Sequence, residues 1–482
     1  MRRSRQQGAD TTVTAGNGPA PLPAGDPPGR PAPLWKRGLA LVSLALSLLL
    51  WLNGLMVSLS RPSVGGELNL RQLELAVLAE PGMPPPLQAL LAGANPAEEL
   101  NRALEQEIQR GAEAGAPAPA ELRLERALLL QRLQQQDEAK ALLQELARDA
   151  EPASPEAQLA RNLLGESNGS LRWPGQRALL RQWSCEALAD GERCGAAAAS
   201  RRALLQLLAV TVLPVVVLLA GCALLLRELW LRWRRRATPM PPLEGPPLSG
   251  LDAVLLIAGG FVVVGELLTP VLVAPLLEAA LGALAVAEPL RAGLTVLSLY
   301  LALMAGPLVI LVLMLRGLGP APAAGWLVFR WQPWPGALHK ALRGLLMVLP
   351  LVSLVGWLQG QLWGDAGGSN PLLDLVLRSQ NPAALACFAL TAVVLAPLFE
   401  ETLFRGVLLP VAGRRLGPLA GVLLSALIFA VAHLSLGELP PLFMLGLGLG
   451  WLRWSSGRLG PCVLMHALWN GLTFCNLLLL GS

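Results

Sequence analysis

Residues 383–409 read AALACFALTAVVLAPLFEETLFRGVLL, an apolar run that nevertheless contains two glutamates and an arginine. A helix needs about 20 apolar residues to cross the hydrocarbon core of a bilayer, and this run is long enough. A charged side chain in that core costs about 3 kcal/mol on insertion scales, so ionisable residues there mark candidate functional sites. The run therefore predicts a transmembrane helix built around a functional polar cluster.

The order of these charged residues gives them different expected roles. Glu401 precedes Arg405 by four positions, so the two share one helix face and can neutralise each other. Glu400 is rotated by about 100° from Glu401 along the helical turn and is left without that partner. We therefore expect Glu401 and Arg405 to support the structure, and Glu400 to remain free for chemistry.

Two later apolar segments also carry polar residues. Phe429 and His433 bound the sequence FAVAH, and His466 and Asn470 bound the sequence HALWN. The members of each pair are four residues apart and share one helix face. This places a ring beside the first imidazole and an amide beside the second. From the helical rise we expect both segments to meet Glu400 within the membrane.

The whole chain has the composition of a membrane protein, which excludes a soluble enzyme. Hydrophobic residues make up 53% of its 482 residues and charged residues 15%, against roughly a quarter charged in soluble domains. The basic residues stand beside apolar segments, which indicates membrane topology and no nucleic-acid partner. We expect an all-α polytopic protein with about nine transmembrane helices, at residues 38–59, 203–226, 251–274, 293–315, 344–362, 383–409, 418–435, 440–452 and 462–480.

Composition shifts divide the chain into five parts. Residues 1–37 are rich in proline, glycine and arginine and predict a disordered basic tail, which an anchor helix at residues 38–59 follows. Residues 60–202 show the periodicity of amphipathic helices and predict a soluble helical domain inserted after the first crossing. Residues 203–250 supply a transmembrane helix and a basic linker, and residues 251–482 form the remaining transmembrane bundle.

Clusters of arginine and lysine lie between every second pair of apolar segments, so that all of them fall on the same side of the membrane, as the positive-inside rule requires. This pattern places the N-terminus in the cytoplasm, in a plasma (inner) membrane or an equivalent one, and residues 60–202 outside. Cys185 and Cys194 could form a disulfide there, with two free thiols as an equal alternative. Helical rise places the polar cluster about 40 Å from the base of the outer domain, which we therefore expect to bind a substrate or partner protein.

The three polar segments resemble the motifs EExxxR, FxxxH and HxxxN of the CPBP family of intramembrane proteases, also called the CAAX protease, bacteriocin-processing or abortive-infection family. The resemblance covers about residues 380–476. It implies a CAAX-type endopeptidase that acts on membrane-associated, prenylated or signal-type protein substrates. In that family the first glutamate and the FxxxH histidine activate water, and the HxxxN pair binds the oxyanion. The resemblance implies these roles for Glu400, His433, His466 and Asn470.

The chemistry of peptide hydrolysis favours the same residues, because it needs a general base for water and a donor to the tetrahedral oxyanion. A carboxylate in apolar surroundings gains affinity for protons, which suits Glu400 as the base, with His433 orienting the water. The amide of Asn470 can donate to the oxyanion, and His466 can do the same or protonate the leaving amine. Phe429 is expected to support His433.

Two alternatives use the same residues differently. Glu400, His433 and His466 could hold a zinc ion with an open position for water. No HExxH pair is present, and we expect no required cofactor. The other alternative is a bundle that binds or transports a ligand without catalysis. Glu266 and Glu278 lie in one apolar region and could mark the broken helix of a transporter.

Overall fold

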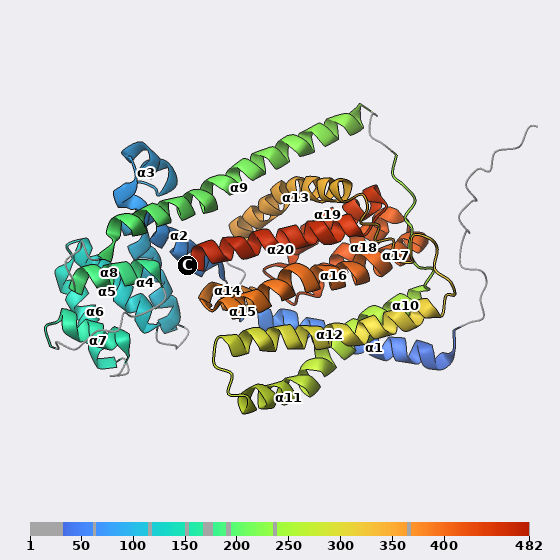
Figure 1. Ribbon diagram of the computed structural model, residues 1–482, viewed down its shortest axis with the longest axis horizontal. Helices are drawn as coiled ribbons and strands as arrows, with labels where there is room; N and C mark the ends of the chain where they lie inside the picture. Colours follow the sequence, from blue (N-terminus) through green and yellow to red (C-terminus); the bar gives the residue numbers. More distant parts are fainter. Residues whose placement is uncertain are drawn as a thin grey trace, which may run out of the picture.

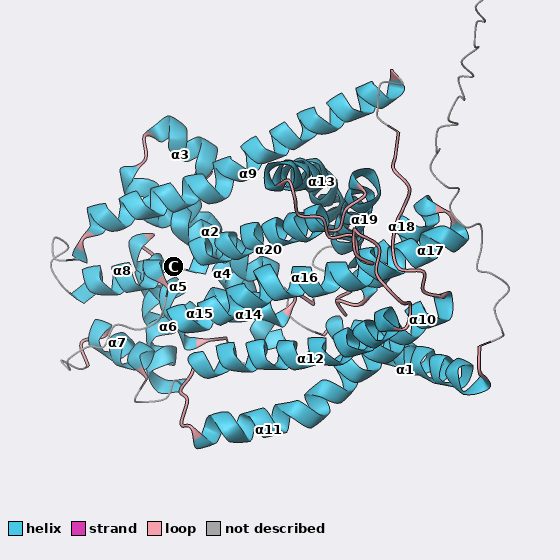
Figure 2. Cartoon of the chain, turned by 45° about the vertical axis from the view of Figure 1, so that its right-hand side comes forward, coloured by secondary structure: helices cyan, strands magenta, loops and turns pink. Residues whose placement is uncertain are grey.

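The computed structural model describes residues 32–60, 64–113, 118–149, 154–166, 177–188, 194–234, 239–363 and 368–481. Every regular element in this part of the chain is a helix, which confirms the expected all-α fold (Figure 2). Of the tail predicted for residues 1–37, residues 1–31 lie outside the described part of the chain.

Helices α2 to α8 gather at one end of the molecule, in the region where the periodicity predicted an outer helical domain (Figure 1). Buried leucines one turn apart form its core, such as Leu100 and Leu104 of α4. Helix α5 packs against α6, and α6 packs against α7. The helices are α2 (Val64–Ala79), α3 (Pro85–Leu91), α4 (Pro96–Glu113), α5 (Ala120–Arg132), α6 (Gln136–Asp149), α7 (Pro155–Leu163) and α8 (Ala178–Leu188).

A buried charge cluster joins three parts of this outer domain. Nη1 of Arg177, just before α8, donates to Glu74 of α2 at 2.6 Å and to Glu125 of α5 at 2.9 Å. Burial raises the pKa of Glu125 to about 8, and repulsion from Glu74 adds to the effect while Arg177 opposes it. Burial also raises the pKa of Glu74. One guanidinium therefore serves two carboxyl groups, and the cluster favours retention of a proton.

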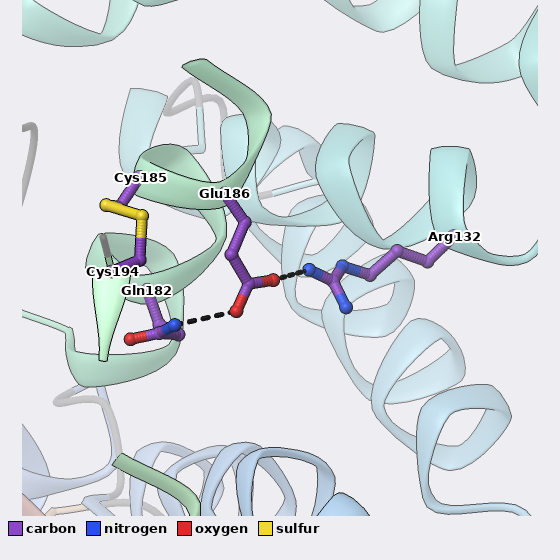
Figure 3. Close-up of a disulfide and its surroundings, with 5 residues drawn as sticks. All are labelled: Arg132, Gln182, Cys185, Glu186 and Cys194. Carbon is purple, nitrogen blue, oxygen red and sulfur yellow. Dashed lines mark hydrogen bonds and ion pairs between the residues drawn. A yellow bond between two sulfur atoms is a disulfide. The ribbon is translucent and has the colours of Figure 1, made fainter. Parts of the chain in front are cut away.

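A disulfide between Cys185 and Cys194 links α8 to the turn before the next helix (Figure 3). Beside it, Glu186 accepts hydrogen bonds from Gln182 at 2.6 Å and from Arg132 of α5. Of the two alternatives left open by the sequence, the structure therefore contains the bonded pair. Structural disulfides persist in oxidising compartments, so the bond agrees with a domain outside the cytoplasm.

Seven helical stretches among the described residues are long and apolar enough to cross a membrane, so the expected count of nine is not confirmed. Helix α18 (Pro418–Val431) is apolar but has only 14 residues, and α19 (Leu439–Ser456) is not among the seven. The seven are α1 (Leu34–Ser58), α9 (Ala196–Trp233), Gly250–Ala283, α12 (Leu290–Arg316), α13 (Trp334–Trp363), Pro382–Leu416 and α20 (Gly460–Gly481).

Two of these stretches contain π-helical segments, in which the backbone is wound more widely than in an α-helix. The first stretch joins α10 (Gly250–Val254), the π-helical η3 (Leu255–Leu268) and α11 (Thr269–Ala283). The second joins α15 (Pro382–Ala389), the π-helical η4 (Leu390–Leu395), α16 (Ala396–Glu401), the π-helical η5 (Thr402–Leu408) and α17 (Leu409–Leu416). Such segments occur often at functional sites.

The outer domain rests directly on the transmembrane bundle. Helix α20 ends beside α2 (Figure 1), and Leu477 and Leu480 of α20 belong to the same buried cluster as the core of the outer domain. Since Leu477 follows His466 by 11 residues on one helix, the two lie only about 17 Å apart. The expected separation of 40 Å was therefore wrong, because the core of the domain packs directly on the end of α20.

Candidate active site

A buried ion pair forms the floor of the candidate site. Nη1 of Arg405 donates to Oε1 of Glu401 at 2.8 Å, and both side chains are fully buried. Nη2 of Arg405 donates to the carbonyl of Gly446 in α19 at 3.1 Å, and the guanidinium lies 4.3 Å from the ring of Phe429. A buried charge needs a partner and further hydrogen bonds. The pairing predicted from the four-residue spacing is present.

Glu401 also fixes an imidazole from another helix. Nδ1 of His466 lies 2.9 Å from Oε1 of Glu401, and His466 is buried. Because Glu401 is paired with Arg405, we assign its carboxylate as the acceptor and Nδ1–H of His466 as the donor. In the neutral imidazole the other ring nitrogen, Nε2, is then the one without a proton and is available to the site. Glu401 therefore does more than balance Arg405, because it sets the tautomer of His466.

Glu400 stands on the other side of this imidazole. Its Oε1 accepts a hydrogen bond from the hydroxyl of Tyr300 in α12 at 3.1 Å. Its Oε2 is buried and makes no hydrogen bond within the described part of the chain. This oxygen lies 4.0 Å from Nε2 of His466, which is too far for a direct hydrogen bond. Glu400 thus presents one fixed and one unoccupied carboxylate oxygen to the site.

His433 lies in the turn after α18, not on a transmembrane helix as predicted for residues 418–435, because the helix ends at Val431. Its Nδ1 donates to the carbonyl of Phe429 at 2.8 Å, and the two rings are 4.8 Å apart. The backbone N–H of Leu436 in the same turn donates to Ser58 of α1 at 3.1 Å. Within the described residues, His433 forms no hydrogen bond or ion pair with Glu400.

Asn470 lies one turn beyond His466 on α20. Its Nδ2 donates to the carbonyl of Ala392 in the π-helical segment η4 at 2.7 Å, which holds the amide toward the helix that carries Glu400. The second hydrogen of this amide remains for another acceptor. The structure thus brings Glu400, Glu401, Arg405, Phe429 and His466 together, with His433 and Asn470 at the edges of the cluster.

Two participants were missed by the sequence reasoning. Tyr300 holds Glu400, and its one signal was its status as the only tyrosine of the chain, placed in the middle of an apolar run. Trp51 of the anchor helix α1 donates its indole N–H to Oε2 of Glu266 at 3.3 Å. The sequence drew attention to Glu266 only as a mark of a transporter.

The donor set considered for zinc is not assembled in this structure. Among the described residues, no three His, Cys, Asp or Glu side chains lie together as metal ligands. Glu400 and His466 approach each other, whereas His433 points toward Phe429. These side chains do not fit a three-ligand zinc site as they stand, and we derive no step through a metal ion.

Comparison with known proteins agrees with the motifs. Residues 382–472 match the family model of type II CAAX prenyl endopeptidase Rce1-like proteins, and residues 65–205 match a domain of unknown function, DUF8675. An uncharacterized 24.3 kDa protein of Escherichia coli is 30% identical over 157 residues, which cover 31% of this chain and 66% of that protein. No solved structure matches. Residues 382–472 therefore form an Rce1-like domain, which is consistent with the CPBP, or CAAX protease, family.

Proposed function

We propose that this protein is an intramembrane endopeptidase in which Glu400 takes a proton from the water that attacks a peptide bond. The observation that carries the proposal is the buried, unoccupied Oε2 of Glu400, which faces Nε2 of His466 at 4.0 Å. The Rce1-like domain supports a CAAX-type protease, and the roles that we give to the individual residues are part of this proposal.

The 4.0 Å gap suits one water molecule. Two acceptor atoms at this separation can each receive one hydrogen of the same water at about 2.8 Å. The oxygen lone pair of that water is then directed at the carbonyl carbon of the substrate. As the new C–O bond forms, one proton passes to Glu400 Oε2 and negative charge moves to the carbonyl oxygen. Collapse of the intermediate breaks the C–N bond, and Glu400 returns the proton to the leaving amine.

The surrounding residues would hold this arrangement in place. Tyr300 fixes the carboxylate of Glu400, and Glu401 fixes the tautomer of His466. The free hydrogen of the Asn470 amide is our candidate donor to the oxyanion. His433, whose Nε2 is not engaged by Phe429, is the second imidazole available to the water or the oxyanion. This ordering gives His466 the place near the water that the sequence had assigned to His433.

We propose membrane-embedded or membrane-associated proteins as the substrates, and a substrate or partner protein for the outer domain. A cavity of about 800 Å³ between α5, α8 and α9, with Trp183 among its lining residues, supports the second point. Basic helix ends and the disulfide support a cytoplasmic N-terminus in an inner or plasma membrane. Labelling of single cysteines in the outer domain from the cytoplasmic side only would contradict this orientation.

The experiment that tests the proposed function compares membranes from cells that produce the wild type and cells that produce Glu400→Ala at equal abundance. New protein N-termini should be present with the wild type and missing with the variant, since only the wild type can activate water. Identical sets of N-termini would favour the alternative of a binding or transport protein built on the same bundle.

Removal of metal ions separates the glutamate mechanism from the zinc alternative. If Glu400 acts as a general base without an ion, incubation of the purified protein with 1,10-phenanthroline or EDTA should change cleavage of a peptide reporter less than twofold. A metal-dependent enzyme would lose its ion and its activity together, because the bound ion itself activates the water. Stoichiometric zinc in active protein, lost together with activity, would replace our proposal by the metal mechanism.

A further inference from the structure

The turn that carries His433 is fastened to the anchor helix α1, which lies outside both family matches. The backbone N–H of Leu436 donates to Oγ of Ser58 at 3.1 Å, and the hydroxyl of Ser58 donates in turn to the carbonyl of Leu55 at 2.7 Å. Ser58 is buried at the end of α1. Its hydroxyl therefore has a fixed direction and presents a lone pair to the turn.

The same helix also meets the turn through a glycine. Leu434 has a φ of 51°, a left-handed conformation that a bulky side chain rarely adopts without support from its surroundings. A Cβ added to Gly54 would lie 2.9 Å from Cδ2 of Leu434 and 3.2 Å from its Cβ. Gly54 is buried in α1. The helix therefore packs against the residue after His433 at a position that has no room for a side chain.

Two further segments also hold this turn. Oγ of Ser435 donates to the carbonyl of Gly368, and the side-chain amide of Gln359 in α13 donates to the carbonyl of Gly437 at 2.5 Å. These bonds do not involve α1. Loss of one contact with α1 would therefore leave the turn attached to the bundle, but free to shift.

A shift of the turn would move the imidazole of His433, because the backbone of His433 continues directly into Leu434. The ring of Phe429 lies 4.8 Å from the ring of His433 and 5.7 Å from the ring of His466, so this phenyl group contacts both imidazoles of the site. A displacement of about 1 Å in a positioned group can lower the rate of an enzyme by roughly a hundredfold. The contacts between α1 and the turn thus bear on the geometry of the site.

We propose that Gly54 and Ser58 are positioning residues for His433, which makes α1 a functional part of the active site as well as a membrane anchor. Gly54 sets how closely α1 approaches Leu434, and Ser58 fixes the backbone at Leu436. Together they keep Nε2 of His433 in a constant position relative to the reacting water or the oxyanion. The inference rests on the proposed function, in which His433 is the second imidazole of the site.

The test measures kcat and KM for the peptide reporter with purified full-length protein. Ser58→Ala removes the acceptor of the backbone N–H, and Gly54→Ala places a methyl group against the turn. Each should lower kcat about tenfold and change KM by less than about twofold, because displacement of a group that acts in the transition state impairs catalysis more than substrate binding. Ser60→Ala and Gly38→Ala are the matched controls and should behave like the wild type. Ser60 is exposed, and no other described part of the chain lies within 4 Å of a Cβ added to Gly38.

Combination with His433→Ala separates a positioning role from a general loss of structure. If the α1 residues act through the imidazole, adding Ser58→Ala or Gly54→Ala to His433→Ala should lower the single-turnover rate further by less than about twofold. A general structural defect would lower the rate by the same factor in both backgrounds. The chain has three histidines, so NMR of protein with labelled histidine rings gives a second readout. Ser58→Ala should move the signal of His433 and leave that of His339 in place.

An unchanged kcat in Ser58→Ala overturns the inference, as does an unmoved His433 signal or an equal loss of rate in both backgrounds. Wild-type activity of His433→Ala overturns it as well. Ser58→Ala decides alone if Gly54→Ala does not accumulate, since it removes a single oxygen atom. Inactivity of Glu400→Gln beside any of these results would leave the proposed function standing. Full activity of Glu400→Gln would overturn both.

Discussion

Glu400→Gln should lower the rate of peptide cleavage by about a thousandfold and leave the protein folded in the membrane. Glutamine has nearly the same shape as glutamate and keeps an oxygen for the Tyr300 hydroxyl, but it cannot take a proton from water. General-base catalysis contributes between about a hundredfold and ten-thousandfold in enzymes. The measurement is the single-turnover rate on the peptide reporter in detergent, together with the amount and melting temperature of the purified variant.

Glu401→Gln is the matched control, because it makes the same chemical change at the neighbouring position. It removes the partner of Arg405, whose guanidinium is fully buried, and an unpaired buried charge costs about 3 to 5 kcal/mol. We therefore expect low abundance and a lower melting temperature for this variant, in contrast to Glu400→Gln. Equal cleavage rates for the wild type and Glu400→Gln would exclude Glu400 as the base.

The outer domain should lose stability as the pH rises from about 5 to 8. The pKa of Glu125 is 4.5 without the fold and about 8 within it, so the folded state binds this proton more tightly than the unfolded chain does. The stabilisation that this proton gives to the fold is complete below pH 4.5, and it is lost as the pH rises through the pKa of about 8 in the folded state. Each unit of pKa difference corresponds to about 1.4 kcal/mol, and we expect a loss of roughly 3 kcal/mol because Arg177 and Glu74 share the charge.

This loss can be followed by the resistance of the outer domain to proteolysis in full-length protein at a series of pH values. Glu125→Gln mimics the protonated carboxyl group, so it should make the domain equally resistant at pH 5 and pH 8. Glu113→Gln, at the exposed end of α4, should retain the pH dependence of the wild type. Resistance that increases with pH in the wild type would contradict the assigned direction.

The spacing of charged residues predicted part of the site because it depends only on the helical repeat. Glu401 and Arg405 pair across one turn, and Glu400 keeps a free carboxylate oxygen, as expected from their order along the helix. The bond between His466 and Glu401 could not be read in this way, since it joins positions 65 residues apart. Tyr300 was missed for the same reason, because its contact depends on how α12 packs against α16.

The boundaries of the membrane helices were harder to predict than their existence. The apolar run of α18 continues past Val431, but the helix stops there, and Leu434 adopts a φ of 51° in the turn that follows. Hydropathy reports the preference of side chains for lipid and carries no signal for such a turn. This is why His433 was placed on a helix, and why residues 418–435 were predicted as one crossing.

Helix α9 mechanically connects the outer domain to the far end of the transmembrane bundle. Its 38 residues form one continuous element about 57 Å long, which begins beside the disulfide and ends at Trp233 (Figure 1). Near its far end Arg232 lies over the ring of Trp451 at 4.9 Å, and α9 packs on α13, which packs on α19. If α9 stayed straight, a 10° tilt of the outer domain would move the Trp233 end of the helix by about 10 Å. Either α9 then bends at Pro214, or the motion is passed on to the backbone of α19, which accepts a hydrogen bond from Arg405. An event at the domain formed by α2 to α8 thus has a mechanical route to the buried ion pair of Glu401 and Arg405.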